Sequence, residues 1–319
     1  MAEPAGTVAN RFAADLDGLI DRGARLGVAV SGGPDSLALL LLATAARPGA
    51  VEAATVDHGL RPAARAEAEQ VGAICGQLGV PHRTLAIDWS DPPAANLQAR
   101  ARAARYAALG EWAQERALAA VATAHHLDDQ AETLLMRLAR GSGVGGLAGV
   151  QAKRQLCEGV MLVRPLLGWR RAELGEIVAA ARLEPVDDPS NRDDRFDRTR
   201  VRALLADTEW LDPTRLAAAA GHLRDAEQAL EWAASRELAQ RRSIEGETLV
   251  LDPAGLPRDL RRRLLLAGIA ALGGEEPPGP KLTAALDALD AGATTTLAGL
   301  KLVGGAAWRL SPAPPRRKT

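Results

Sequence analysis

Short apolar runs alternate with longer helical segments over the first 140 residues, and this alternation restricts the fold more than any other feature of the chain. The runs short enough for strands lie at residues 26–30, 51–56, 83–87 and 118–123. Each is followed by a segment of helical character, at residues 36–46, 62–78, 95–116 and 125–140. Strands that alternate with helices form a parallel sheet with helices on both faces. We therefore predict an α/β fold with a parallel, doubly wound sheet.

The pattern changes after about residue 206. Helical segments follow at residues 213–242 and 258–272, and the sequence before the carboxyl-terminal tail favours a β-hairpin. A chain of 319 residues is long enough for two domains. We predict an α/β catalytic domain over residues 1–205 and a smaller, mainly helical domain with a terminal hairpin over residues 206–319.

The composition is that of an ordinary globular protein, with 47% hydrophobic and 25% charged residues. A net charge of −1 argues neither for nor against a nucleic-acid partner. The only cysteines, Cys75 and Cys157, are too far apart for a zinc ribbon or a redox pair. The amino terminus lacks the apolar segment of a signal peptide, and the longest apolar stretch, residues 37–46, is too short to span a membrane. We expect a cytoplasmic protein.

A glycine-rich loop links the first predicted strand to its helix. Its residues are Ser31, Gly32, Gly33, Pro34, Asp35 and Ser36. Glycine lets the backbone approach an anion, and a loop that opens a helix directs free N–H groups at that anion. The Asp35 carboxylate would repel phosphates unless a cation lay between them, which indicates Mg²⁺. Because no G-x-x-x-x-G-K-[S/T] motif is present, we predict an ATP-binding loop of another class.

Three polar groups fall at the carboxyl ends of predicted strands: the glycine loop, Asp57-His58 and His125-His126. Ligands bind at this edge of an open parallel sheet, so the groups favour one nucleotide site. We expect Asp57 and His58 beside the adenosine, with helix capping as the alternative for Asp57. The glycine-rich stretch at residues 141–149 suits a linker and an active-site loop equally well.

Charged residues on the predicted helices near this edge are candidates for metal and substrate binding. His125, Asp129 and Glu132 are spaced i, i+4, i+7 and would share one helical face. Such a set can hold Mg²⁺, accept a proton or bind an amine. Arg102 and Arg105 are spaced i, i+3 and can act together on a phosphate or on the substrate. A solvated helix face is the alternative for both sets.

Five strings of the sequence carry a resemblance to a known family. They are V-D-H-G-L-R-P at 56–62, N-L-Q-A-R-A-R-A-A-R-Y at 96–106, the stretch that begins T-A-H-H-L-D-D-Q-A-E-T at 123–149, R-P-L-L at 164–167, and D-D-P-S-N-R-D-D-R-F-D-R-T-R-V-R at 187–202. The S-G-G-x-D-S loop resembles that of the ATP pyrophosphatase superfamily, and the ordered strings resemble the tRNA(Ile)-lysidine synthetase family. One departure is Arg198-Thr199-Arg200, where the family usually has Arg-Asn-Arg.

The resemblance implies a ligase that uses ATP and Mg²⁺. ATP adenylates the C2 oxygen of the wobble cytidine in the CAU anticodon of isoleucine tRNA and releases pyrophosphate. The ε-amine of free L-lysine then attacks C2 and displaces AMP, and the lysidine formed changes codon reading from AUG to AUA. The residues expected at the metal are Asp35, Asp129 and Glu132; those expected in catalysis are Asp35, His125, Asp129, Glu132 and Arg202; those expected to bind substrate are Arg102, Arg105, Asn191, Arg198 and Arg200.

The arginine-rich segment at residues 192–202 is expected to close over ATP and the anticodon loop, because arginine suits phosphate. A surface salt-bridge network is its alternative. The second domain is expected to recognise tRNA, and the six tryptophans are expected in the core or at interfaces. Rival functions are a tRNA thiolase, for which sulfur-carrying cysteines are missing, a small-molecule amide ligase, and an RNA-binding module that releases no pyrophosphate.

Overall fold

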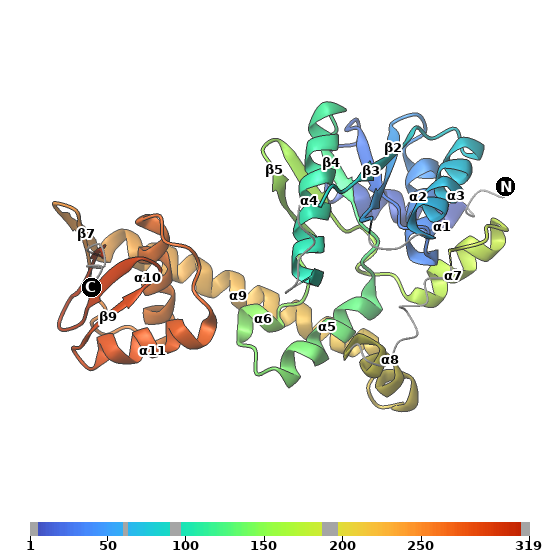
Figure 1. The fold of residues 1–319 in the computed structure, drawn as a ribbon. Helices are drawn as coiled ribbons and strands as arrows, with labels where there is room; N and C mark the ends of the chain where they lie inside the picture. Colours follow the sequence, from blue (N-terminus) through green and yellow to red (C-terminus); the bar gives the residue numbers. More distant parts are fainter. Residues whose placement is uncertain (1–5, 60–62, 90–96, 187–196, 314–319) are drawn as a thin grey trace. The chain divides into compact units, whose positions relative to one another are not determined.

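A computed structural model describes residues 6–59, 63–89, 97–186 and 197–313 (Figure 1). The chain divides into two compact units, Met1–Leu223 and Arg224–Thr319, each of which is described by itself. The division falls inside the long helix α9, Pro213–Arg241. The functional boundary predicted between residues 205 and 206 stays a prediction.

The first unit contains a six-stranded sheet in the order β3-β2-β1-β4-β6-β5. Five of these strands pair in parallel: β1 Leu26–Ala29, β2 Val51–Asp57, β3 His82–Ala86, β4 Ala120–Ala122 and β6 Val160–Val163. The predicted parallel sheet is therefore confirmed for these strands. It is wrong at one edge, because β5, Lys153–Cys157, runs antiparallel to β6. Only two residues connect β5 to β6, and so short a connection requires a hairpin.

Helices cover both faces of this sheet, as predicted, because α1, α2, α3 and α7 share a core on one face while α4 packs on the other. Their bounds are α1 Gly6–Asp17, α2 Pro34–Ala46, α3 Ala63–Gln77, α4 Leu97–Glu115, α5 Leu127–Ala139, α6 Val144–Leu147, α7 Arg171–Ala180 and α8 Asp197–Asp207. Helix α2 is buried along residues 36–43 because it is apolar on all sides. No helix in the described ranges is long and apolar enough to cross a membrane.

The second unit contains a five-stranded antiparallel sheet in the order β7-β8-β11-β10-β9. Its elements after α9 are β7 Arg242–Glu245, β8 Thr248–Leu251, α10 Arg258–Ala271, α11 Gly279–Asp290, β9 Thr294–Leu297, β10 Leu300–Val303 and β11 Trp308–Pro312. The core between sheet and helices includes Leu251, Leu265, Ile269 and Trp308. The predicted terminal hairpin, β9–β10, is thus part of a larger sheet, and "mainly helical" understates the strand content of this unit.

Candidate active site

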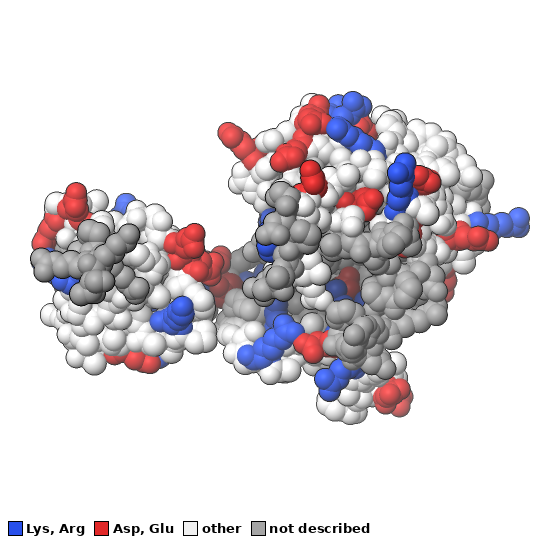
Figure 2. Space-filling model, viewed as in Figure 1, with Lys and Arg blue, Asp and Glu red and all other residues white. Residues whose placement is uncertain are grey.

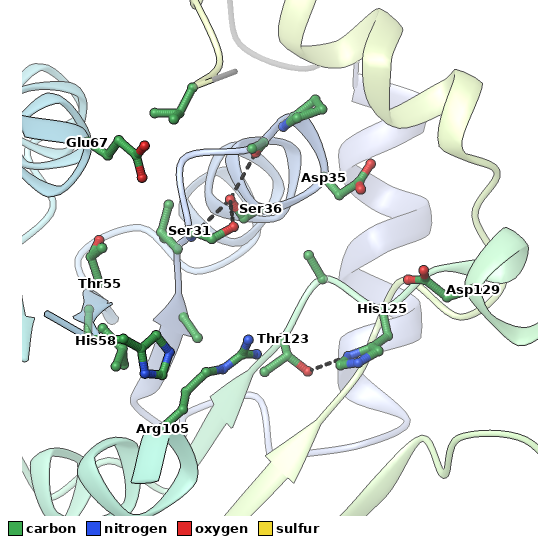
Figure 3. Close-up of a pocket in the computed structure, with 18 of the residues that line it drawn as sticks. Ser31, Asp35, Ser36, Thr55, His58, Glu67, Arg105, Thr123, His125 and Asp129 are labelled. Atoms are coloured by element: carbon green, nitrogen blue, oxygen red, sulfur yellow. Dashed lines mark hydrogen bonds between the residues drawn. The ribbon is translucent and has the colours of Figure 1, made fainter. Parts of the chain in front are cut away.

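The glycine loop is folded around the hydroxyl of Ser36. Ser36 Oγ accepts a hydrogen bond from the Ser31 backbone N–H at 3.1 Å and donates to the Gly33 carbonyl at 2.9 Å (Figure 3). Gly33 is the N-cap of α2, and Pro34 occupies the first turn, where a missing N–H costs nothing. The first turn of a buried, apolar helix is thereby fixed at the end of β1, with its dipole available to an anion.

The two glycines of the loop have different roles. Gly32 has a φ of +86°, its carbonyl accepts the Val186 N–H at 2.9 Å, and a Cβ there would lie 2.6 Å from Val186 Cγ2. Gly33 has no such neighbour, since the nearest atom to its added Cβ would be Ser31 Oγ at 3.8 Å. Gly32 is therefore required by the backbone, whereas Gly33 leaves the face toward the cavity open for close approach of a ligand.

We expect Gly32→Ala to weaken ATP binding by at least about tenfold, because the positive φ costs about 1–2 kcal/mol and the methyl group displaces Val186 from the loop. Calorimetric titration with ATP measures the change. Gly49→Ala is the matched control, because Gly49 also has a positive φ, of +73°, but has open space around it. The expectation is contradicted if both variants bind ATP as the unaltered protein does.

A cavity of about 710 Å³ lies beside the loop at the carboxyl ends of β1, β2 and β4, a size within the range of small-molecule sites. It brings together most of the residues that the sequence nominated. These are Ser31, Gly33, Pro34, Asp35, Ser36, His58, Arg105, His125, Asp129, Arg198 and Arg202. Segments from 31 to 202 in the sequence thus share one site, as the convergence of strand ends predicted.

Other nominated residues do not line the cavity: Gly32, Asp57, Arg102, Glu132 and Arg200. Asp57 Oδ1 instead accepts the Gly59 N–H at 2.8 Å and stabilises the turn after β2. Arg200 is exposed on α8, and Arg102 lies against Tyr106. Asn191 is outside the described residues.

His125 does not share a helical face with Asp129 and Glu132, so that part of the spacing argument is wrong. Helix α5 begins at Leu127, and Asp129 Oδ2 accepts the His126 backbone N–H at 3.1 Å across its first turn. His125 lies in the preceding loop, with its Nδ1 3.1 Å from Thr123 Oγ1. Burial lowers the pKa of His125 to about 3, and nearby arginines add to the effect. The imidazole is therefore neutral and able to accept a hydrogen bond.

The sequence pattern placed His126 at a strand end, together with His125, but gave it no role in the site. It is fully buried; its Nε2 lies 3.4 Å from Asp35 Oδ2 and 3.6 Å from Asp129 Oδ2, and its Nδ1 lies 3.6 Å from Asp128 Oδ2. Burial opposes a charge on this ring, but the three carboxylates outweigh it and raise the pKa of His126 to about 9. The protonated His126 ring thereby links Asp35 of the glycine loop to Asp128 and Asp129 of α5. The signal in the sequence was a second histidine separated by only Leu127 from the pair Asp128-Asp129.

The carboxylate of Asp35 has capacity for a further ligand. Its Oδ1 is buried and has no hydrogen-bond partner among the described residues, and Asp129 also faces the cavity. In the described ranges, no three His, Cys, Asp or Glu side chains gather closely enough to hold a metal ion alone. A magnesium ion here would need oxygen ligands from a nucleotide as well as from the protein, which is how Mg²⁺ usually binds phosphates.

Glu132 is 1% exposed and is surrounded by arginines from two other helices. Arg202 Nε and Arg198 Nε of α8 lie 2.7 and 2.9 Å from its carboxylate oxygens, and Arg171 Nη2 of α7 lies 3.4 Å away. Arg198 also reaches Asp129, at 3.7 Å. Glu132 therefore holds α8 against α5, and its partners Arg198 and Arg202 also line the cavity.

A nucleotide-sized cavity beside a glycine loop at the edge of a parallel sheet defines a PP-loop ATP-binding protein, and a family model described as a PP-loop domain matches residues 6–209. The tRNA(Ile)-lysidine synthase of Novosphingobium aromaticivorans is 50% identical over 315 residues, which cover 97% of this chain and 95% of that protein. That of Zymomonas mobilis is 45% identical, covering 92% and 90%. The chain belongs to the tRNA(Ile)-lysidine synthase family, which confirms the prediction from its motifs.

Among solved structures, the U34-tRNA thiolase NcsA from Methanococcus maripaludis matches with a TM-score of 0.57 and 17% identity, over 69% of this chain and 79% of that one. At this identity the likeness concerns the fold alone, and it confirms the predicted α/β class. It carries no argument for sulfur transfer.

Proposed function

We propose that this chain, an ATP-dependent ligase that forms lysidine in tRNA, works in two steps at the carboxyl edge of the sheet. One observation carries the proposal: the glycine loop, the unpartnered Asp35 oxygen, neutral His125 and Asp129 all face one cavity. Its tRNA substrate is proposed to be the isoleucine tRNA with a CAU anticodon, and its amine substrate free lysine.

In the first step the loop residues 31–36 bind the phosphates of ATP, and His58 lies toward the adenosine. Burial, with Arg105 nearby, lowers the pKa of His58, and its Nδ1 has no partner among the described residues, so it can accept a hydrogen bond. Asp35 and Asp129 would hold Mg²⁺, which neutralises phosphate charge when bound. Arg198 and Arg202 line the same cavity, and we propose that they contact these phosphates. The C2 oxygen of cytidine takes the adenylyl group and pyrophosphate leaves.

In the second step the lysine amine attacks C2, the new C–N bond forms, and the C–O bond to AMP breaks. The amine must first lose a proton, so a base is required. His125 is neutral and Asp129 is a carboxylate in the same cavity, and we propose that these two accept hydrogen bonds from the lysine ammonium and orient it, while its proton passes to solvent. Glu132, predicted as a metal ligand, is proposed instead to hold Arg198 and Arg202 in position.

Residues 206–319 are proposed to recognise other parts of the tRNA, because methionine tRNA shares the CAU anticodon and the anticodon alone cannot distinguish the two. Acidic and basic side chains are interspersed over the face shown in Figure 2, so its charge does not mark a single RNA path. Specific contacts rather than bulk charge would then select the tRNA.

The test supplies the protein with ATP, Mg²⁺, radiolabelled lysine and unmodified isoleucine tRNA that carries the CAU anticodon. We expect one label per tRNA, dependent on ATP, with release of AMP and pyrophosphate, and no label in methionine tRNA. Folded protein that leaves the isoleucine tRNA unlabelled would rule out the proposed reaction. Tight tRNA binding without pyrophosphate release would favour the non-catalytic RNA module.

A further inference from the structure

A third carboxylate, that of Glu67 on helix α3, lines the reaction cavity away from Asp35 and Asp129. Asp35 and Asp129 lie together, since both approach the buried ring of His126, at 3.4 and 3.6 Å. Glu67 comes from a different element and lies on the other side of the glycine loop (Figure 3). The cavity therefore has a second acidic position, which the proposed reaction does not use.

The side chain of Thr55 on strand β2 borders the same part of the cavity. Thr55 is 6% exposed and lines the cavity, and its Oγ1 lies 2.9 Å from Nε2 of His82 on β3. Side chains alternate along a strand, and Ala53 packs into the core that α3 shares, so Thr55 also lies on the α3 face of the sheet. Because α3 packs directly on β2, Thr55 and Glu67 line the cavity from two adjacent elements.

The contact with His82 leaves the Thr55 hydroxyl able to make one more hydrogen bond. Burial lowers the pKa of His82, so its ring is neutral and has one donor and one acceptor nitrogen. If Nε2 donates, the hydroxyl proton of Thr55 is available to a ligand; if Nε2 accepts, the hydroxyl oxygen can still accept a hydrogen bond. In both tautomers the matching group on a ligand is a hydroxyl, because a hydroxyl can donate and accept.

The charge of Glu67 restricts which part of ATP can bind beside it. A carboxylate repels phosphates, and the phosphates are provided for by the glycine loop. The nucleoside half of ATP is neutral and offers hydrogen-bond donors. Adenine has a single amino group, whereas ribose has two neighbouring hydroxyls, which match the two oxygens of one carboxylate. A carboxylate has about four acceptor sites, so Glu67 can bind ribose while it keeps contacts within the protein.

We propose that Glu67 and Thr55 bind the ribose hydroxyls of ATP, and that His82 holds the Thr55 hydroxyl in position. The inference rests on the proposed function, in which residues 31–36 bind the phosphates. The ribose then lies between α3 and the end of β2, and the phosphates extend from it along the loop toward Asp35. Contacts at both ends of ATP hold its α-phosphate at one place in the cavity, where the C2 oxygen of cytidine can attack it.

The test measures the binding of ATP, 2′-deoxy-ATP and 3′-deoxy-ATP by calorimetric titration with Mg²⁺, without tRNA or lysine. We expect the unaltered protein to bind ATP about 10- to 100-fold more tightly than the deoxynucleotide that lacks the contacted hydroxyl, the size of a hydrogen bond to a charged group. In Glu67→Ala the Kd for ATP should rise by a similar factor, while the Kd for that deoxynucleotide changes by less than about twofold. Thr55→Val, which keeps the shape of the side chain, should reduce the preference by about 3- to 10-fold.

Glu69→Ala is the matched control, because Glu69 is on the same helix, is exposed, pairs with Arg65 at 3.3 Å and does not line the cavity. It should leave all three affinities unchanged. Alanine is a strong helix former, so α3 should remain folded in both variants.

The inference is overturned if the unaltered protein binds the three nucleotides equally, or if Glu67→Ala weakens all three equally. It is also overturned if Glu67→Ala keeps the preference for ATP over both deoxynucleotides but binds GTP more tightly, because Glu67 would then contact the base. Failure of the folded, unaltered protein to bind ATP would instead remove the proposed function itself.

Discussion

Replacing Asp35 by asparagine is expected to reduce pyrophosphate release by at least about 100-fold, the largest effect that we predict. Asparagine keeps the shape of the side chain but removes the negative charge from the first turn of α2, where Oδ1 is buried and has no partner in the part of the chain that the structure describes. The proposed Mg²⁺ site loses a carboxylate, and His126 loses one of its three counter-charges. Single-turnover release of pyrophosphate from ATP and tRNA measures the effect.

Binding of tRNA should be nearly unchanged in Asp35→Asn, because the carboxylate belongs to the loop that is proposed to bind the phosphates of ATP. Stability should fall only slightly, since a carboxylate at a helix amino terminus contributes about 0.3–1 kcal/mol. Asp21→Asn is the control, because Asp21 is exposed in the turn before β1. Pyrophosphate release at the unaltered rate, at the same Mg²⁺ concentration, would refute the assignment of Asp35 to the metal.

Replacing Glu132 by glutamine is expected to destabilise the protein by about 1–3 kcal/mol and to slow adenylation by at least about tenfold. Removing one partner of a fully buried ion pair costs about 3–5 kcal/mol. We expect a smaller loss here because the arginines around Glu132 are partly exposed to solvent. Arg198 and Arg202 would also lose the group that aims them into the cavity. Thermal denaturation measures the first effect and single-turnover pyrophosphate release the second.

Glu115→Gln is the matched control for Glu132→Gln. Glu115 also pairs with an arginine, but both side chains of that pair are more than half exposed, and such pairs contribute little. It should change neither the melting temperature nor the adenylation rate. If Glu132→Gln behaves in the same way, Glu132 does not position the arginines. If Glu132→Gln instead changes the Mg²⁺ concentration needed for pyrophosphate release, the original prediction that Glu132 binds the metal regains support.

Patterns among neighbouring residues of the sequence correctly predicted the structural elements that depend on neighbouring residues. The four strand–helix units and the glycine loop follow from apolar periodicity and from loop chemistry, and all of them are present. The β5–β6 hairpin was missed because β5 is an edge strand of mostly polar residues, Lys153–Cys157, without a continuous apolar run. Three of the six tryptophans, Trp112, Trp169 and Trp308, are buried as expected, but Trp210 and Trp232 are 78% and 63% exposed.

The missed parts of the site depend on contacts between distant segments. His125 was assigned to a helix because spacing does not show where a helix begins; the cap formed by Asp129 on His126 sets that start at Leu127. The partners of Glu132 come from α7 and α8, and nothing in its own helix reveals them.

The β5–β6 hairpin has an evolutionary consequence. Nucleotide chemistry resides in the repeated strand–helix units, while β5 is an antiparallel addition at the edge of the sheet. Edge strands change without disturbing the pairing of the interior strands, so selection can act on the two regions separately. Strand β5 could therefore change during evolution while the mode of ATP activation is retained.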